Sequence, residues 1–319
     1  MSADHAQTEK QTMSTNPIGL VGLGKMGGNM ARRLAAKDMS VIGYNDNPEA
    51  VGDLAALDNV DLADSLEDLV SRLPIPRVIW LMLPAGDVTD SVVDKLGALL
   101  DDGDVLVDGA NSYYKDTQRN GDKLAASGIE FVDAGVSGGI WGLEKGYTLM
   151  VGGSDRAFAR VEPYIRALAP SDDNGWIHTG PVGSGHFVKM IHNGIEYGMM
   201  QAYAEGFALM RGHKDFGLDV ADIAETWRHG SVVRSWLLDL TADVLAGDAE
   251  LDDVAPYVAD SGEGRWTALE AIEQGVPTPV MSLALMARFA SQGKQDYSAR
   301  LLAMMRNQFG GHAVKRGDS

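Results

Sequence analysis

A glycine-rich turn near the start of the chain limits the choice of fold more than any other stretch. An apolar run, Ile18–Val21, leads into Gly22-Leu23-Gly24-Lys25-Met26-Gly27, and a helix-compatible segment over 28–37 follows. This is G-x-G-x-x-G between a strand and a helix, the context that a dinucleotide fingerprint requires. The first glycine permits the tight turn, the second lets the backbone approach a pyrophosphate, and the third lets the helix pack on the strand. Residues 22–27 are therefore expected to bind a dinucleotide, helped by the free N–H groups at the helix N-terminus.

The next predicted strand, 41–44, ends in Asn45-Asp46-Asn47-Pro48-Glu49. Asp46 follows the last glycine of the loop at the spacing where an acidic side chain contacts the ribose hydroxyls of the adenosine. NADP calls for an arginine or lysine near its 2′-phosphate, and residues 45–50 contain neither. The sequence therefore favours NAD, with NADP as the alternative, although Asp46 and Asn47 are also ordinary turn residues.

Further strands are predicted at 78–83, 105–107 and 131–133, each after a helix-compatible segment, and 148–153 and 176–179 extend the series. Such alternation indicates an α/β fold with a mostly parallel, doubly wound sheet. Ligands of these sheets bind at the carboxyl ends of the strands. The candidates there are small or uncharged: Leu83, Pro84, Ala85, Asn111, Ser137, Gly138 and Gly139.

From residue 184 onward the chain is predicted to be helical, over 184–212, 219–228, 232–247, 265–274, 279–291 and 294–307. We place the domain boundary at the Gly180-Pro181-Val182-Gly183 break. The expected organisation is a flexible tail (1–16), a Rossmann-type dinucleotide-binding domain (17–182), and an all-helical domain (183–319) for substrate binding and dimerisation that ends in a C-terminal tail.

The first of these helices carries the strongest candidate for chemistry. At about 100° per residue, one face presents Lys189, His192, Asn193, Glu196 and Tyr197, and then turns apolar with Met200, Tyr203 and Phe207. An apolar continuation indicates that this face looks inward. A lysine and a glutamate two turns apart on such a face fit an acid/base pair in a pocket, and equally a buried ion pair.

Composition narrows the partners. The net charge of −18 and the pI near 4.7 argue against nucleic-acid and anionic-membrane partners. The acidity is mostly a solvated surface, and adaptation to high salt is a second reading. The chain has no cysteine, no long apolar run and no signal-peptide pattern in its first residues, which together favour a cytoplasmic protein. No H-x-x-x-H or H-E-x-x-H motif occurs, so a metal site is not expected, and neither is the nucleophile elbow of a hydrolase.

An anionic substrate would need a local basic cluster on so acidic a chain. Arg265, Arg288 and Arg306 are candidates, because the guanidinium fork suits phosphate, although each alone is more typical of a surface ion pair.

With these residues laid out, the sequence resembles the short form of the decarboxylating 6-phosphogluconate dehydrogenases. The resemblance extends from Ile18 to His312 and is strongest at 22–29, 108–119, 135–153 and 185–198. Related β-hydroxyacid dehydrogenases share the glycine loop, the Gly-x-Ser-Gly-Gly turn and the lysine, but are not expected to share the His-Asn-Gly-Ile-Glu-Tyr run.

The resemblance implies roles that composition and spacing do not. Lys189 matches the general base that takes the proton of the 3-hydroxyl, and Glu196 the acid that protonates C1 of the enediol after carbon dioxide departs. The residues that match the cofactor and sugar-acid contacts are Asn111, Ser137, Gly138, Gly139, His192 and Asn193. Those that match the phosphate contacts are Tyr197, Arg265, Thr267 and Arg288. Arg306 and His312 match a tail pair that reaches the active site of a neighbouring subunit. A homodimer or larger homo-oligomer follows from the tail pair.

The implied reaction is oxidative decarboxylation of 6-phospho-D-gluconate to ribulose 5-phosphate in the pentose phosphate pathway, without a metal. Lysine must begin the cycle neutral, and its protonated form then stabilises the enolate. The chain departs from the long form by lacking a second helical repeat, by Arg265 in place of lysine, by Asp46 in place of a basic residue, and by Ala110 in place of glycine. Two rivals remain: a β-hydroxyacid dehydrogenase of smaller unphosphorylated acids, and a catalytically silent dinucleotide-binding protein.

Overall fold

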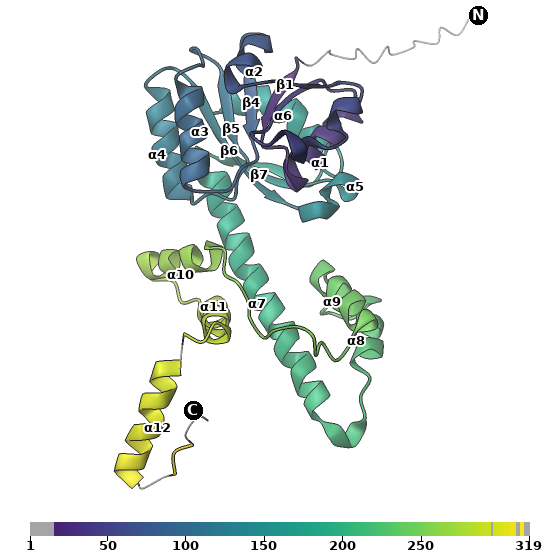
Figure 1. The fold of residues 1–319 in the computed structure, drawn as a ribbon, viewed down its shortest axis with the longest axis vertical. Coiled ribbons are helices and arrows are strands. Elements are labelled where there is room, and N and C mark those ends of the chain that lie inside the picture. The colour runs from purple at the N-terminus through teal and green to yellow at the C-terminus, as the bar shows by residue number, and fades with distance from the viewer. Residues whose placement is uncertain (1–15, 295, 311–312, 316–319) are drawn as a thin grey trace, which may run out of the picture. The chain divides into compact units, whose positions relative to one another are not determined.

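The computed structural model describes residues 16–294, 296–310 and 313–315. Of the expected N-terminal tail only Asn16 is among them, and His312 lies outside them. The chain divides into two compact units, Met1–Lys189 and Met190–Ser319, which we call the sheet unit and the helical unit. A Rossmann-type sheet followed by an all-helical part is confirmed, and each unit is described below by itself (Figure 1).

The sheet unit contains one eight-stranded sheet in the order β3-β2-β1-β4-β5-β6-β7-β8. All neighbouring strands are parallel except β6 and β7. The order reverses between β1 and β4, which is where doubly wound sheets bind their ligands. The strands are β1 (Ile18–Val21), β2 (Val41–Tyr44), β3 (Val60–Leu62), β4 (Val78–Leu81), β5 (Val105–Asp108), β6 (Glu130–Ser137), β7 (Thr148–Gly152) and β8 (Trp176–Gly180).

Two strand predictions need correction. Strand β3 was not predicted, because three residues with one buried side chain give almost no alternation. Strand β6 continues to Ser137, so Gly135-Val136-Ser137 belong to the strand and do not follow it. The extra length has a clear cause: residues 130–133 pair with β5, and residues 133–137 pair with the antiparallel β7.

Helices cover both faces of this sheet. One core cluster lies around Trp80 and Val107 and the other around Leu81 and Leu106, so alternate residues of β4 and β5 face opposite layers. The helices are α1 (Lys25–Ala35), α2 (Leu66–Arg72), α3 (Asp87–Gly97), α4 (Tyr114–Ala125), α5 (Gly142–Lys145) and α6 (Asp155–Leu168), with short 3₁₀ turns η1 (Pro48–Val51), η2 (Leu54–Ala56) and η3 (Gly139–Trp141).

Helix α7 (Ser184–Gly212) begins in the sheet unit and continues through the boundary at 189/190. The rest of the helical unit, in its described part, consists of short helices, as predicted. They are η4 (Lys214–Phe216), α8 (Val220–Arg228), α9 (Trp236–Gly247), α10 (Glu263–Gln274), α11 (Pro279–Ser291) and α12 (Asp296–Gly310).

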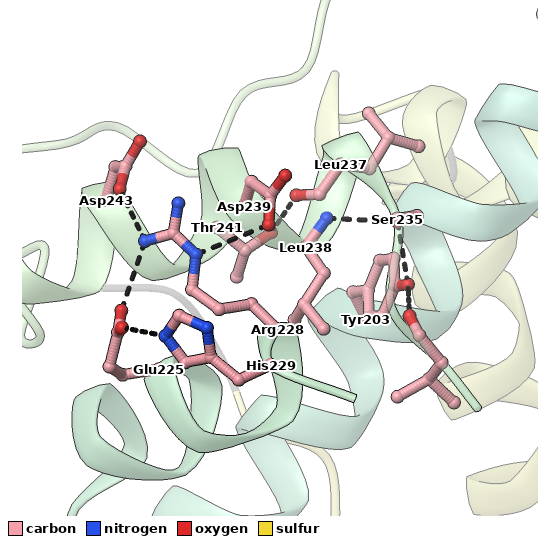
Figure 2. Close-up of polar contacts among 11 residues, drawn as sticks. Tyr203, Glu225, Arg228, His229, Ser235, Leu237, Leu238, Asp239, Thr241 and Asp243 are labelled. Carbon is pink, nitrogen blue, oxygen red and sulfur yellow. Dashed lines mark hydrogen bonds and ion pairs between the residues drawn. The ribbon is translucent and has the colours of Figure 1, made fainter. Parts of the chain in front are cut away.

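An arginine-centred cluster fixes α8 to α9 (Figure 2). The Arg228 guanidinium contacts Glu225 at 3.1 Å, Asp243 at 3.0 Å and Asp239 at 3.3 Å. His229 Nε2 lies 2.6 Å from Glu225 Oε1. The hydrogen bonds from His229 and Arg228 lower the pKa of the Glu225 carboxyl. Charge therefore supplements the small apolar core between these two helices.

Many large apolar side chains of the helical unit face outward. They include Val244 on α9, Ile272 on α10, Val280 and Leu283 on α11, and Leu302 on α12. A cavity of about 480 Å³ between α7, α8 and α9 is lined mostly by apolar residues. Among the described residues, no helix is both long and apolar enough to cross a membrane.

Candidate active site

The glycine loop has the shape that dinucleotide binding requires. Gly22 has φ +91°, a conformation that favours glycine. A Cβ on Gly27 would overlap the carbonyl oxygen of Gly22, so the third glycine lets α1 pack against the turn. A Cβ on Gly24 would have no neighbour within 4 Å among the described residues, so these residues leave this side of the loop open for a ligand. Gly24 is also the N-cap of α1 and brings no side chain to cap its first turn. The loop therefore fits the pyrophosphate of a dinucleotide.

The turn after β2 supports this loop. The Leu23 N–H donates to Asn45 Oδ1 at 2.8 Å, and Asn45 Nδ2 donates to the Asn47 carbonyl at 2.8 Å. Asn47 Oδ1 accepts from the Glu49 N–H. The side chains of Asn45 and Asn47 therefore stabilise the conformation of this turn. Asp46 between them is exposed.

The neighbouring strand ends complete the edge of the sheet. Pro84 and Ala85 after β4 are exposed, and Leu83 is half-buried. The Thr89 hydroxyl donates to the Pro84 carbonyl at 2.8 Å and holds this loop. Asn111 is exposed beyond β5, Ser137 is half-buried at the end of β6, and Gly138 and Gly139 both have positive φ.

Asp133 fixes the start of α7. This fully buried carboxylate accepts the Gly183 N–H at 2.7 Å and the His186 N–H at 2.8 Å. Cβ atoms on Gly185 and Gly135 would overlap, respectively, the Met150 carbonyl and the Lys189 side chain. The absence of side chains at these glycines therefore seats α7 on β6 and β7 and makes room for the stem of Lys189, which is buried. Sequence reasoning missed Asp133; an aspartate in an apolar strand was the available signal.

Burial along α7 agrees with the predicted inward face. Lys189, Tyr197 and Phe207 are buried, whereas Ile195 and Leu209 on the opposite face are exposed. Within the helical unit, His192 Nδ1 lies 3.0 Å from Asn193 Oδ1 and 3.8 Å from Glu196 Oε2. Each of these three side chains is half-buried. Glu196 therefore has the His192 imidazole as its neighbour one turn earlier on α7.

Two of the predicted phosphate residues meet on the helical unit. The Arg288 guanidinium carbon lies 3.4 Å from the centroid of the Tyr197 ring, and Arg288 Nη1 donates to the Ala259 carbonyl at 3.0 Å. The Tyr197 hydroxyl lies 3.5 Å from Ser261 Oγ. The loop before α10 thus orients both a guanidinium and a phenol.

Arg265 approaches the same loop from α10. Its Nε donates to Asp260, whose side chain is almost fully buried, and its guanidinium lies over the Phe289 ring. Asp260 also accepts the Gly262 N–H at 3.1 Å. Asp260 was not predicted; its position just before a helix and near an arginine was the available signal. An arriving phosphate would compete with Asp260 for Arg265.

Thr267 faces the backbone. Its buried hydroxyl lies 3.0 Å from the Met190 carbonyl and 2.8 Å from the Glu263 carbonyl. A Cβ on Gly194 would overlap this threonine, and one on Gly264 would overlap the Tyr197 ring. These two glycines let α10 pack closely on α7. Arg306 is exposed on α12, and its predicted companion His312 lies outside the described residues.

The fold and the glycine loop together define a dinucleotide-binding α/β protein with a helical partner unit. Residues 16–294, 296–310 and 313–315 contain no group of three or more His, Asp or Glu side chains that could hold a metal ion.

Comparison with known proteins identifies the family. Residues 17–180 match the NAD-binding domain of 6-phosphogluconate dehydrogenase, and residues 185–308 match the C-terminal domain of 6-phosphogluconate dehydrogenase. The chain is 42% identical over 302 residues to a protein of Haloferax volcanii named NAD(+)-dependent, decarboxylating 6-phosphogluconate dehydrogenase, with 94% of this chain and 99% of that one covered. It is 41% identical over 299 residues, with the same coverage, to a Bacillus subtilis protein named putative 6-phosphogluconate dehydrogenase YqeC.

A solved structure shows the same likeness. The 6-phosphogluconate dehydrogenase of Plasmodium falciparum, described in its apo form and in complexes with NADP+ and with 6-phosphogluconate, superposes with a TM-score of 0.80 at 29% identity. The match covers 95% of this chain and 67% of that chain. This chain therefore belongs to the 6-phosphogluconate dehydrogenase family.

Proposed function

We propose that the protein oxidises and decarboxylates 6-phospho-D-gluconate to ribulose 5-phosphate and carbon dioxide, with NAD as the preferred cofactor and NADP as the alternative. The observation that carries the proposal is the face of α7, where Lys189 and Glu196 stand two turns apart on one continuous helix. The names of the relatives at about 40% identity support the same reaction. Residues 17–182 would serve the cofactor, and residues 183–319 the substrate and assembly.

Lys189 is the proposed general base. As a neutral amine it takes the proton of the substrate 3-hydroxyl, and the bound cofactor supplies the acceptor for the hydride from C3. The product of this step is a β-keto acid, whose carbonyl receives the electrons of the breaking bond to carbon dioxide. The Lys189 ammonium then stabilises the resulting enolate through its positive charge. Glu196, beside His192, donates the proton to C1 of the resulting enediol, the carbon that was C2 of the substrate.

The remaining side chains position the substrate and cofactor. Arg265 and Arg288, with Tyr197 and Thr267, are proposed to bind the phosphate, since arginine binds it through two parallel hydrogen bonds. The backbone of 22–27 holds the pyrophosphate and Asp46 the adenosine ribose. Loops 83–85 and 137–139, with Asn111, His192 and Asn193, border the nicotinamide and the sugar acid.

The experiment measures initial rates on 6-phosphogluconate with NAD and with NADP while released carbon dioxide is trapped. The expected result is reduction of the cofactor with stoichiometric carbon dioxide, and a higher kcat/KM with NAD. Reduction without carbon dioxide would favour a β-hydroxyacid dehydrogenase. Tight NAD binding with no turnover of any sugar acid would favour a silent binding protein.

We further propose that the protein is a homodimer or larger homo-oligomer in which the C-terminal tail, with Arg306 and His312, reaches a neighbouring active site. The exposed apolar residues of α9 to α12 support it, since apolar patches of this kind mark association surfaces. Light scattering on purified protein would show a mass of at least two chains. We place the reaction in the cytoplasm, which cell fractionation tests.

A further inference from the structure

Two fully buried carboxylates lie side by side at the end of the sheet. Asp108 is the last residue of β5, and it pairs in register with Asp133 on the parallel strand β6. Both side chains are shielded from solvent and both extend toward the layer that contains α4. Two such neighbours cannot both be ionised without a large electrostatic cost.

The two carboxyl groups differ in their hydrogen-bond partners. Asp133 uses both of its carboxylate oxygens to accept backbone N–H groups at the N-terminus of α7. Asp108 Oδ1 accepts the Ala110 N–H at 3.0 Å, but the buried Asp108 Oδ2 has no hydrogen-bond partner among the described residues. Burial raises the pKa of Asp108 by more than His186, the hydrogen bond with Ser112 and the hydrogen bond from the Ala110 N–H lower it, and the charge of Asp133 raises it further. Asp108 is therefore the neutral acid.

A second buried group, the His186 imidazole, lacks a hydrogen-bond donor within the described chain. His186 lies one turn before Lys189 on α7, and its Nδ1 is 2.7 Å from the Thr117 hydroxyl. Its buried Nε2 has no hydrogen-bond partner in the part of the chain that the structure describes. The Thr117 hydroxyl donates to the Tyr113 carbonyl at 3.3 Å. Thr117 then accepts from Nδ1–H, and Nε2 becomes an acceptor. A protonated Asp108 is the donor that this nitrogen lacks.

We propose that Asp108 and His186 form a neutral, proton-sharing pair that positions Lys189 and Asn111. The Asp108 Oδ2 hydroxyl donates to His186 Nε2, directly or across one water, and the chain of donors continues through Thr117 to Tyr113. Asp108 Oδ1 holds the turn that leads from the end of β5 to Asn111, and His186 lies in the helical turn that precedes Lys189. The pair therefore connects these two parts of the molecule. Only the effect of this pair on catalysis rests on the proposed function.

The neutrality of Asp108 matters for the hydrogen bond. A carboxylic acid can donate to His186 Nε2, whereas an ionised carboxylate has no proton to donate. Asp108 and His186 are thus positioning residues, and neither is expected to touch substrate.

Four variants test the pair, with kcat and KM measured for 6-phosphogluconate. Asp108→Asn keeps a neutral donor toward His186 Nε2, so kcat is expected to stay within about threefold of wild type. Asp108→Ala leaves Nε2 unpaired and is expected to lower kcat by about tenfold or more while KM changes little. Asp133→Asn loses one of two acceptors at the start of α7 and is expected to lower the melting temperature. His178→Gln, in the same unit, is the matched histidine control and is expected to leave kcat unchanged.

Long-range ¹H–¹⁵N correlation spectra of the ¹⁵N-histidine-labelled wild-type protein read the tautomer of His186, assigned by comparison with His186→Gln. We expect a protonated Nδ1 and an unprotonated Nε2 at neutral pH. A proton on Nε2 would overturn the assignment of the proton to Asp108. Loss of activity in Asp108→Asn as great as in Asp108→Ala, or wild-type kcat in both, would overturn the positioning role. If the wild-type protein does not turn over 6-phosphogluconate, the proposed function fails, while the spectra still decide whether the pair exists.

Discussion

The two units of the molecule use their apolar residues in opposite ways. In the sheet unit, strands β1, β4 and β5 are buried along their whole length, and helices cover both faces of the sheet. In the helical unit, α10 and α11 leave residues such as Ile272 and Leu283 mostly exposed, and one small core holds α8 to α9. The sheet unit completes its own interior, whereas the helical unit presents surfaces that a second chain can complete. The buried Lys189 belongs to the first unit, and we propose that self-association uses the second.

The largest predicted effect follows from this division. Lys189→Arg keeps the charge but replaces a base with a group that is always protonated, so kcat should fall by about a hundredfold to ten-thousandfold. The mass of the assembly should not change. Steady-state rates and light scattering check both, with Lys95→Arg at the exposed end of α3 as the matched control. Near-normal turnover in Lys189→Arg would remove Lys189 as the base.

Features that depend on local sequence could be predicted, whereas features that depend on contacts between distant segments could not. The glycine loop and the helix over 184–212 could be predicted in detail, because turn chemistry and a long apolar periodicity are local signals. The extension of β6 could not, since it depends on the antiparallel partner β7. Asp133 and Asp260 were missed for a related reason: each acts on residues that only the fold brings next to it, namely the start of α7 and Arg265.

The glycine loop offers a sharper test of the completed interior. Gly27→Ala places a methyl group against the Gly22 carbonyl and should destabilise the protein by about 3 kcal/mol or more. Gly24→Ala meets no protein atom within 4 Å, so stability should hold while the KM for NAD rises by about tenfold. Thermal unfolding and cofactor titration separate the two outcomes. Equal loss of stability in both variants would contradict the assignment of separate roles to these glycines.

The exposed faces of the helical unit should respond to charge. Val280 and Val88 are each the second residue of a helix, α11 and α3, where an acidic side chain suits the helix dipole. Val280→Asp should weaken self-association by about tenfold or more, because it places a charge on a surface that we propose to be an interface. Val88→Asp, in the sheet unit, should leave association unchanged. Sedimentation at several concentrations measures both, and an unchanged mass for Val280→Asp would exclude this part of α11 from the interface.

The smallest effect concerns the closed interior at high pH. Burial raises the pKa of Tyr164 to about 12, and its hydroxyl donates to the Asn16 carbonyl at 2.7 Å. The unfolded chain releases this proton near pH 10 while the folded one retains it, so the free energy of unfolding falls as pH rises from about 10 to about 12.

The variant Tyr164→Phe should have a free energy of unfolding about 1 kcal/mol lower at neutral pH, because it loses one hydrogen bond. It should also show a shallower alkaline slope in denaturant titrations. Tyr147, with a pKa also raised to about 12, contributes the same slope to both proteins, so the difference between them isolates Tyr164. Parallel slopes would mean that Tyr164 ionises in the folded protein as readily as in the unfolded one, and that the sheet unit is open at this point.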